Sequence, residues 1–238
     1  MKGLKKFFKY FFITLILAII IIGSIIFFNG YSLYKDTIAE LPVKETLEEI
    51  RNQENFIKYD ELPDIFINAV VSVEDKRFFS HSGYDLISIG RAMITNIKDR
   101  ELSEGGSTIT QQIAKNIFFS QRKEFTRKVA EVFVAIDIEE IYNKEEIFEI
   151  YVNTNFYGSG NYGIFEAAKG FYEKNVSDLT DYEATLLAGV PNAPSVYSPK
   201  VNLSLAERRQ SIVLNKMIDA GYLTKEEAKI IEEKQITK

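Results

Sequence analysis

The stretch EFTRKVAEVFVAIDIEEIY, residues 124–142, carries apolar side chains on almost every side of the helix that its spacing predicts. A helix that is apolar all round is normally central in a folded domain. Residues 64–74, 84–98, 108–119 and 145–153 also have helical spacing, and no stretch alternates convincingly enough to require a sheet. The sequence therefore predicts a mainly α fold around residues 124–142.

Composition excludes several classes of protein. The chain has 238 residues, enough for one well-packed domain with appendages, and a formal net charge of -5 that gives no support to nucleic-acid binding. Because the chain has no cysteine, disulfide frameworks, thiolate nucleophiles and cysteine-ligated zinc are excluded, and its one histidine excludes a histidine-rich metal site. Any chemistry therefore falls to carboxylates, lysines, arginines and hydroxyl groups.

An N-terminal segment is apolar enough to cross a membrane. FFITLILAIIIIGSIIFF, residues 11–28, carries no charge and is close to the roughly 20 residues that span a bilayer core. Lysines at positions 2, 5, 6 and 9 precede it, so the positive-inside rule places the N-terminus in the cytoplasm and the chain after Asn29 outside. A cleaved signal peptide is the alternative, but no A-x-A cleavage pattern follows. We expect a cytoplasmic stub and retained anchor over residues 1–29 of a single-pass cell-membrane protein, and an extracytoplasmic domain that depends on activated substrates because it has no ATP supply.

The rest of the chain divides into two parts. Residues 30–60 are polar and weakly periodic, which predicts a stalk before a compact domain over residues 61–238. Within that domain, residues 84–98 are unusually apolar for a helix between two polar motifs. This helix is interpreted either as core or as a segment that dips into the membrane surface, with Lys98 and Arg100 at the lipid headgroups.

The motif EDKRFFSHSGYD, residues 74–85, follows an apolar helix directly. Glu74 lies near the C-terminal end of that helix, where the macrodipole and partial burial both raise the pKa of a carboxyl group toward the range of a general base or acid. The alternative is a solvated ion pair with Lys76 or Arg77. We expect His81 to pin the turn and position Glu74 rather than to act as a proton shuttle.

A second motif, GGSTITQQIAK at residues 105–115, opens a helix. Thr108 and Gln111 have the spacing of a capping box, and the free N–H groups of a helix N-terminus favour a phosphate. Gln111 and Lys115 share a face with Thr108, and Gln112 lies beside it. The motif predicts either a polar ligand groove or an ordinary amphipathic helix with a capped start.

A third motif, RKVAE at residues 127–131, puts charges on the mostly apolar helix. Arg127 and Glu131 are one turn apart with Lys128 beside them, so an internal ion pair is one interpretation. The other is a second carboxylate in a cleft with Glu74, because sugar chemistry often uses two carboxylates in different environments. Such a carboxylate could also help to hold a divalent ion on a diphosphate, flanked by Lys115, Lys123 and Arg127.

Taken together, these stretches resemble the peptidoglycan glycosyltransferases of glycosyltransferase family 51, the transglycosylase domain of class A penicillin-binding proteins. Residues 74–85 resemble the family's E-D-x-x-F-x-x-H-x-G motif, residues 105–116 its second motif and residues 127–131 its R-K-x-x-E motif. KEEIFEIYVN at residues 144–153 and the arginine pair of RRQSIVL at residues 208–214 follow in the family's order. The resemblance covers roughly residues 60–222 and implies a lysozyme-like, two-lobed helical domain with a larger head lobe and a smaller, membrane-proximal jaw lobe at roughly residues 84–104.

The resemblance implies an inverting glycosyl transfer with Glu74 as the general base. Glu74 would take the proton from the 4-hydroxyl of the acceptor lipid II, and that oxygen would attack the lipid-linked glycan chain with release of undecaprenyl diphosphate. Glu131 is implied as a second catalytic residue that helps Lys115 and Arg127 to stabilise the diphosphate, with a divalent metal, Mg or Mn, possible at Glu131. No organic cofactor is implied, and the expected partners are lipid II, the lipid-linked glycan chain, the bilayer and cell-wall synthesis proteins.

The remaining site residues are also carried over from the resemblance. Substrate-binding roles are implied for Arg91, Ser107, Gln111, Gln112, Lys115, Lys123 and Arg127. Structural or supporting roles are implied for Asp75, His81, Lys128, Asn153, Arg208 and Arg209.

The sequence departs from the family at a few positions. Asn161 stands where alanine is usual, and Lys123 stands where arginine is frequent. SQRK at residues 120–123 matches S-x-x-K, but no K-T-G follows, so we expect a monofunctional polymerase rather than one with a transpeptidase domain. Two rival functions remain: a lysozyme-like lytic muramidase and a non-catalytic, membrane-anchored cell-wall scaffold.

Overall fold

The computed structural model describes residues 2–99, 105–119 and 125–234. Within those ranges the chain is helical with no β-strand, apart from two isolated bridges, so the predicted mainly α fold is confirmed. The α-helices are α1 (Lys2–Glu40), α2 (Val43–Arg51), α3 (Asp64–Glu74), α4 (Leu86–Asp99), α5 (Ile109–Phe118), α6 (Phe125–Ile141), α7 (Lys144–Thr154), α8 (Gly163–Tyr172), α9 (Asp181–Gly189), α10 (Pro194–Tyr197), α11 (Pro199–Ala220) and α12 (Lys225–Glu233).

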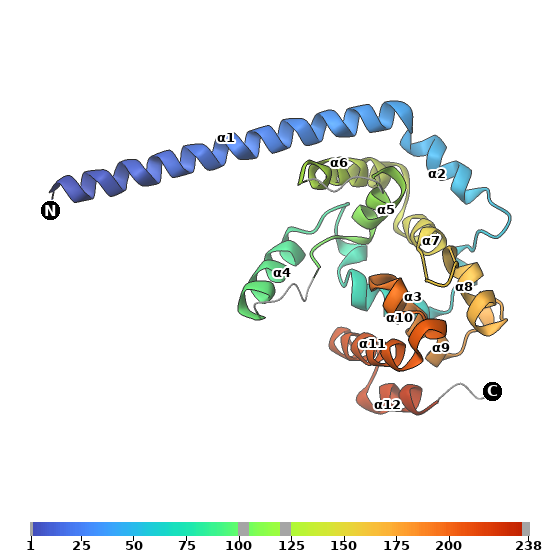
Figure 1. Cartoon of the computed structure of the whole chain (residues 1–238). Coiled ribbons are helices and arrows are strands. Elements are labelled where there is room, and N and C mark those ends of the chain that lie inside the picture. Colours follow the sequence, from blue (N-terminus) through green and yellow to red (C-terminus); the bar gives the residue numbers. More distant parts are fainter. Residues whose placement is uncertain (1, 100–104, 120–124, 235–238) are drawn as a thin grey trace.

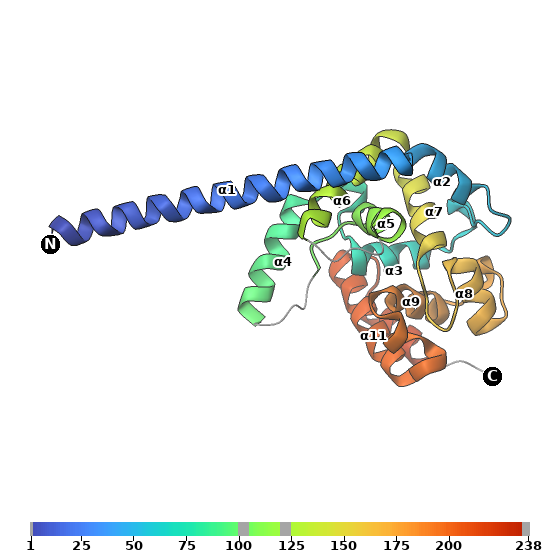
Figure 2. The same ribbon diagram turned by 45° about the horizontal axis from the view of Figure 1, so that its top comes forward.

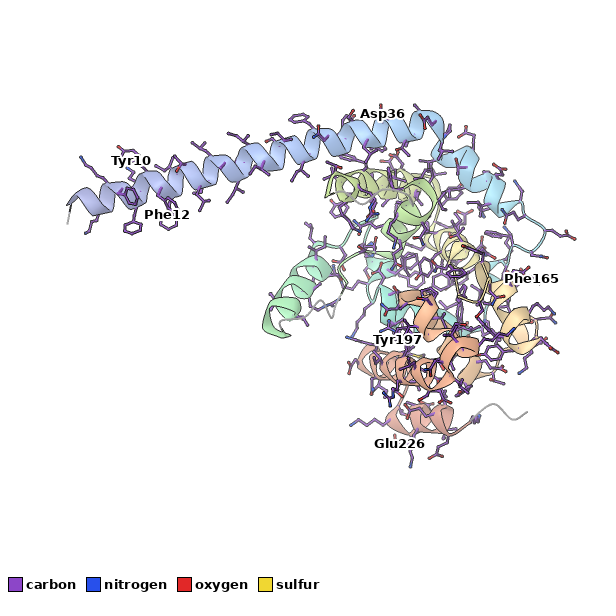
Figure 3. The ribbon with its side chains drawn as sticks, in the orientation of Figure 1. Tyr10, Phe12, Asp36, Phe165, Tyr197 and Glu226 are labelled. Atoms are coloured by element: carbon purple, nitrogen blue, oxygen red, sulfur yellow. The ribbon has the colours of Figure 1, made fainter. Side chains whose placement is uncertain are left out.

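The first helix extends far beyond the body of the molecule (Figure 1). Tyr10 and Phe12 lie on its projecting half, where the side chains point away from every other element (Figure 3). One helix of the described chain, Lys5–Glu40, is long and apolar enough to cross a membrane. This is the segment that the sequence predicts as an anchor.

The C-terminal part of α1 packs on α6. The Phe133 ring lies with its centroid 5.2 Å from that of Tyr31 and 5.3 Å from that of Tyr34. On the inward side of α6, Ala130 and Val134 are fully buried. Residues 124–142 are therefore apolar on most sides because two sides are covered, one by the core and one by α1.

Residues 30–60 differ from the polar stalk that the sequence predicts. α1 continues to Glu40 and α2 begins at Val43, and the hydrophobic core of the head includes Leu33, Tyr34 and Leu47. These apolar side chains lie on one side of helices that are polar on the other, so the segment has low average hydropathy although it is packed. The head therefore begins before residue 61.

The body of the molecule has a large lobe and a smaller projection. α3 lies against α9 and α11, and α5 packs between α6 and α7, which together form the head. α4 stands apart from the head on the side toward which α1 projects (Figures 1 and 2). Leu86 and Ile94 on α4 are about 70% exposed, at 71% and 70%, so α4 is not the core helix that was one interpretation of residues 84–98.

Candidate active site

Glu74 is the last residue of α3, and its side chain is only 11% exposed. The preceding turns place Phe66 and Ala69 fully in the core, so the helix delivers its terminal acid among buried neighbours. Gln112 donates from Nε2 to Glu74 Oε2 at 2.9 Å, and Arg209 Nη2 lies 3.9 Å from Oε1. The acid therefore lies inside the fold, between α5 and α11.

The surroundings make the Glu74 carboxyl group more basic. Burial raises its pKa, and the charge of Asp75 adds to the rise. The hydrogen bond from Gln112 and the charges of Arg209 and Lys115 oppose the rise, but burial outweighs them. The upward pKa shift predicted from the sequence is confirmed, and a group shifted in this direction is better suited to accept a proton.

Asp75 connects the Glu74 turn to the start of α5. Its Oδ2 accepts a hydrogen bond from the backbone N–H of Ile109 at 3.0 Å and lies 2.9 Å from Nε2 of His81. At the same helix start, Thr108 and Gln111 form a reciprocal capping box, which confirms the motif predicted from their spacing. The buried Asp75 carboxylate thus holds the start of α5, the helix that carries Gln112, the hydrogen-bond partner of Glu74.

Arg77 and Asp85 join the same turn to α4. Arg77 donates from Nε to Asp85 Oδ2 at 2.8 Å and from Nη2 to Oδ1, and Asp85 also accepts from the N–H groups of Ile87 and Ser88. The Arg77 guanidinium holds the pKa of Asp85 well below its usual range. The position of α4 is therefore tied to the loop that follows Glu74.

A cleft of about 640 Å³ opens beside Glu74. Its walls come from α3, α4, α5, α6 and α11, which are widely separated in sequence. The cleft brings together many of the residues predicted from the sequence, namely Glu74, Asp75, Arg91, Ser107, Gln111, Gln112, Lys115, Lys128 and Arg209.

A second hollow of about 340 Å³ adjoins the first. Gln112 and Lys115 line both, and Arg127 and Asn116 line the second. Lys115 therefore stands where the two hollows meet, with Arg209 among the cations of the cleft and Arg127 in the adjoining hollow.

Glu131 is fully buried and forms an ion-pair cluster within α6. Its Oε1 lies 2.9 Å from Nε of Arg127, and its Oε2 accepts from Nζ of Lys128 at 2.7 Å. Lys128 also lies 3.3 Å from the Ser107 hydroxyl at the edge of the cleft. The structure thus forms the internal ion pair predicted as one interpretation of RKVAE.

The donor set around Glu131 does not fit a metal held by the protein. Both of its carboxylate oxygens already face cations, and no group of three or more His, Asp or Glu side chains suited to a metal ion occurs within residues 2–99, 105–119 and 125–234. Hard divalent cations prefer several oxygen ligands. A Mg or Mn ion at Glu131 would therefore depend on the substrate diphosphate for most of its oxygen ligands.

The remaining predicted residues lie away from the reacting centre or outside the described chain. Asn153 donates to the carbonyl oxygen of Ile57 at 2.8 Å and accepts from its N–H at 3.0 Å, which fastens the segment before α3 to α7. Arg208 is exposed on α11, whereas its neighbour Arg209 faces Glu74. Lys123 and the jaw residues 100–104 lie outside the described residues.

Sequence reasoning missed other residues that line the two hollows. Asn116 lies one turn after Gln112, so helical spacing within the second motif could have identified it. Asn192 and Lys216 line the cleft from the C-terminal third of the chain, and no local pattern marks them. Asn192 follows α9 and Lys216 lies on α11, so their positions depend on how these two helices pack against α3.

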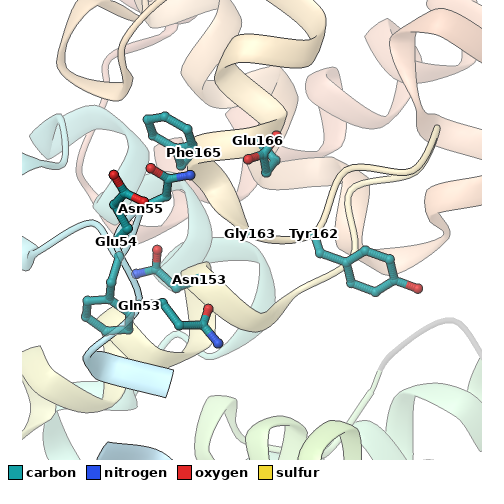
Figure 4. A pocket seen from close by; sticks show the side chains of 9 residues that line it. Gln53, Glu54, Asn55, Asn153, Tyr162, Gly163, Phe165 and Glu166 are labelled. Carbon is teal, nitrogen blue, oxygen red and sulfur yellow. The ribbon is translucent and has the colours of Figure 1, made fainter. Parts of the chain in front are cut away.

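A separate pocket of about 200 Å³ lies beside α7 and α8 (Figure 4). Gln53, Asn55 and Asn153 line it on one side, opposite Tyr162 and Glu166. Asn153 is the one predicted site residue in its described lining, and its side chain is already hydrogen-bonded to Ile57. The cleft beside Glu74 is therefore the candidate active site.

The helical head, the buried acid and the ordered motifs together match a known family. The family model described as Transglycosylase matches residues 42–218, and the chain belongs to this family. The matched region includes α2, in agreement with a head that begins before residue 61.

The chain is also similar to parts of longer proteins. The chain is 44% identical over 169 residues to penicillin-binding protein 1A of Neisseria flavescens and 40% identical over 192 residues to penicillin-binding protein 1A/1B of Bacillus subtilis, covering 71% and 80% of this chain. It spans about a fifth of those relatives, 21% in both cases. A crystal structure of penicillin-binding protein 1A from Haemophilus influenzae covers 76% of this chain and 18% of that chain, with a TM-score of 0.46 and 23% identity.

Proposed function

We propose that this chain is a peptidoglycan glycosyltransferase that polymerises glycan strands from lipid II. The observation that carries the proposal is the environment of Glu74: a buried carboxyl group with a raised pKa, at a cleft with Lys115 and Arg209, in a member of the Transglycosylase family. Buried acids of this kind are typical of general bases.

Glu74 would act on the acceptor sugar. Its carboxylate takes the proton from the 4-hydroxyl of the N-acetylglucosamine of lipid II, and the oxygen attacks the anomeric carbon of the muramic sugar at the reducing end of the growing chain. The bond from that carbon to the diphosphate breaks on the opposite face, so an α-linked diphosphate becomes a β-1,4 glycoside. General-base assistance of this kind supplies about 10²- to 10⁴-fold in rate.

Cations would stabilise the leaving group. The departing undecaprenyl diphosphate takes up the electron pair of the broken bond, and Lys115 and Arg127 line adjoining hollows where that charge can be met. Glu131 would support this step indirectly, because it orients Arg127 and Lys128 from a fully buried position.

The membrane would deliver both substrates, since each is attached to a lipid. In this arrangement α1 crosses the bilayer with its N-terminus in the cytoplasm, and the exposed apolar side chains of α4 meet the outer membrane surface. The donor groove would then lie close to the lipid headgroups, lined by Arg91, Ser107, Gln111 and Gln112.

The test is direct. Purified full-length protein in detergent is incubated with labelled lipid II, and polymer is separated from monomer by gel electrophoresis. We expect wild type to form polymer and Glu74→Gln to form none while giving the same circular-dichroism spectrum. A folded wild-type protein that leaves lipid II unchanged would favour the scaffold.

A lytic muramidase is the alternative enzyme, because a single acid can also assist hydrolysis. It would not require cations at a diphosphate, whereas this chain has Lys115, Arg127 and Arg209 around the two hollows. The same protein is therefore also given finished cell wall, and release of soluble fragments from it would support the muramidase.

A further inference from the structure

Three of the buried polar atoms that lack a hydrogen-bond partner among the described residues belong to Glu74, Tyr151 and Asn155. They are Oε1 of Glu74, the hydroxyl of Tyr151 and Nδ2 of Asn155. Such atoms are rare in folded proteins and cost stability, so each requires an explanation. Tyr151 is 1% exposed and Asn155 is 3% exposed, so bulk water does not provide one.

The packing of α5 on α7 puts these atoms in one place. At the beginning of the two helices, Glu139 accepts from both Thr110 of α5 and Lys144 of α7, each at 2.7 Å. Toward their ends, Asn116 of α5 donates to Asn155 at 3.3 Å. α5 and α7 therefore pack against each other, with Asn116 and Asn155 in contact at their C-terminal ends.

The contact between Asn116 and Asn155 relates Tyr151 to Gln112. Gln112 is one turn before Asn116 on α5, and Tyr151 of α7 is one turn before Asn155, the residue that follows α7. Gln112 holds one oxygen of Glu74, Oε2. The contacts from Glu74 to Gln112 and from Asn116 to Asn155 therefore bring the buried Tyr151 into the neighbourhood of the carboxylate.

Electrostatics agree with this placement. Burial raises the pKa of Tyr151 well above its usual range, and the charge of Glu74 is the next largest cause of the rise. The Tyr151 hydroxyl thus keeps its proton at neutral pH and can donate it. The side chain of Asn155 approaches the same hydroxyl without closing a full hydrogen bond.

We propose that Tyr151 is a positioning residue for Glu74: its hydroxyl donates to Oε1, the oxygen that Gln112 does not engage, when the carboxylate carries its charge. Asn155 orients the hydroxyl. Catalytic hydrogen bonds are often long in an unliganded enzyme and shorten in the complex, and three such atoms also suffice to hold one bridging water. The role rests on the proposed function, in which Glu74 is the general base.

The donor would favour the charged form of Glu74. It works together with Gln112 and Lys115 of α5 and Arg209 of α11, and against Asp75 and burial. The Glu74 charge also raises the pKa of a second buried tyrosine, Tyr157. Removing the Tyr151 hydroxyl should therefore make Glu74 harder to ionise.

The test is Tyr151→Phe, which removes the hydroxyl and keeps the ring. We expect the acidic limb of the pH profile of kcat for lipid II polymerisation to move about half a unit to one unit toward higher pH. Below that limb kcat falls about 3- to 10-fold, and at high pH it returns to the wild-type value. KM for lipid II stays unchanged, whereas a general loss of packing would lower kcat at every pH.

Tyr172→Phe is the matched control. The Tyr172 hydroxyl is also buried and has no hydrogen-bond partner within the described chain, but its pKa responds to Glu183 and Tyr182 rather than to Glu74. It should leave the pH profile unchanged. Equal shifts in the two variants, or no shift in Tyr151→Phe, would overturn the proposal.

A measurement without substrate separates this proposal from the function on which it rests. The carboxyl carbon of Glu74, identified by its loss in Glu74→Gln, is titrated by carbon-13 NMR in the full-length protein. We expect a higher midpoint in Tyr151→Phe and a smaller rise in Asn155→Ala. Failure of wild type to use lipid II would refute the function, whereas an unchanged midpoint would refute the role of Tyr151.

Discussion

At the scale of one residue, burial of the Glu74 carboxylate lowers the stability of the fold, although the proposed chemistry requires this group to be buried. Burial disfavours its charge, and Arg209 and Lys115 recover part of that cost. A carboxyl group whose pKa is raised in the folded state binds its proton more tightly there than in the unfolded chain. Stability is therefore lost as pH rises from the unfolded pKa through the folded pKa.

The first prediction concerns Glu74→Gln. Without a general base, polymerisation should fall by at least about 100-fold. Because the amide has no charge to bury, the melting temperature should equal or exceed that of wild type above the folded pKa of Glu74, and the difference should shrink as pH falls through it. Calorimetry at several pH values and the lipid II assay measure both effects, and a variant that melts lower at neutral pH would contradict this account.

The second prediction concerns Lys115→Ala. Loss of one cation from the junction of the two hollows should reduce kcat by about 100-fold while the melting temperature changes little. Lys229→Ala is the control, because Lys229 is an exposed lysine on α12 with a loose ion pair at 3.6 Å. If Lys115→Ala lowered stability and activity in proportion, Lys115 would have a packing role instead.

Among individual residues, the sequence predicted best those properties that depend on nearby positions in the chain. The rise in the Glu74 pKa followed from its place at the end of an apolar helix. The approach of Arg209 to Glu74 did not follow, because 135 positions of chain separate them and only the packing of α11 on α3 joins them. The position of Tyr151 near Glu74 could not be predicted for the same reason, because the two residues are far apart in the sequence.

Among the elements, α5 is the one whose position matters most to the site. It carries Gln112 and Lys115, and its start is held by its own capping box and by the Asp75 carboxylate. The Thr108 hydroxyl also donates to the carbonyl oxygen of Gly83 at 2.7 Å, which ties α5 to the turn after Glu74. A small shift of this helix would move both residues relative to the acid.

The third prediction compares two capping boxes. Thr108→Ala and Thr224→Ala each remove the cap of a helix, α5 and α12 respectively, at a cost of about 1 kcal/mol. Denaturant titration should give the larger loss of stability for Thr108→Ala, because this change also removes the buried hydrogen bond to the carbonyl oxygen of Gly83. Only Thr108→Ala should also reduce kcat, because α12 contributes nothing to the described lining of the cleft. Equal activities in the two variants would show that the start of α5 does not control the site.

Capping boxes could be predicted because they depend on residues three positions apart. The Thr108–Gln111 box is present, and Thr224 begins α12 after Gly221 adopts a left-handed conformation. The helical state of residues 30–40 was missed because it depends on a distant partner, Phe133 of α6. The segment is polar on average, and its few apolar residues, such as Leu33 and Tyr34, lie on one narrow face of the helix.

For the whole molecule, the contact between α1 and α6 joins the apolar span to the helical head. Gly30 permits the close approach: a Cβ at this position would lie 2.5 Å from Cβ of Val129 and 2.7 Å from the carbonyl oxygen of Thr126. Tyr34 adds a hydrogen bond to Asp137 at 2.8 Å. α6 also carries Arg127, so a change at this contact would reach the site.

The fourth prediction is that Gly30→Ala loosens this contact. The overlap should cost about 1–3 kcal/mol, more than the gain in helix propensity, and activity should fall. Gly23→Ala is the control on the same helix, because nothing lies within 4 Å of its added Cβ. Thermal unfolding and the lipid II assay in detergent measure both, and identical behaviour of the two variants would argue against coupling through α1.

The unbroken course of α1 has a mechanical consequence. A continuous helix from Lys2 to Glu40, packed through aromatic rings at its C-terminal end, is a rigid connection rather than a flexible linker. In the proposed enzyme, the cleft beside Glu74 would keep a constant height and orientation relative to the membrane surface. The growing glycan strand would then leave the cleft in one direction. The geometry of α1 would therefore influence the direction in which new cell wall is made.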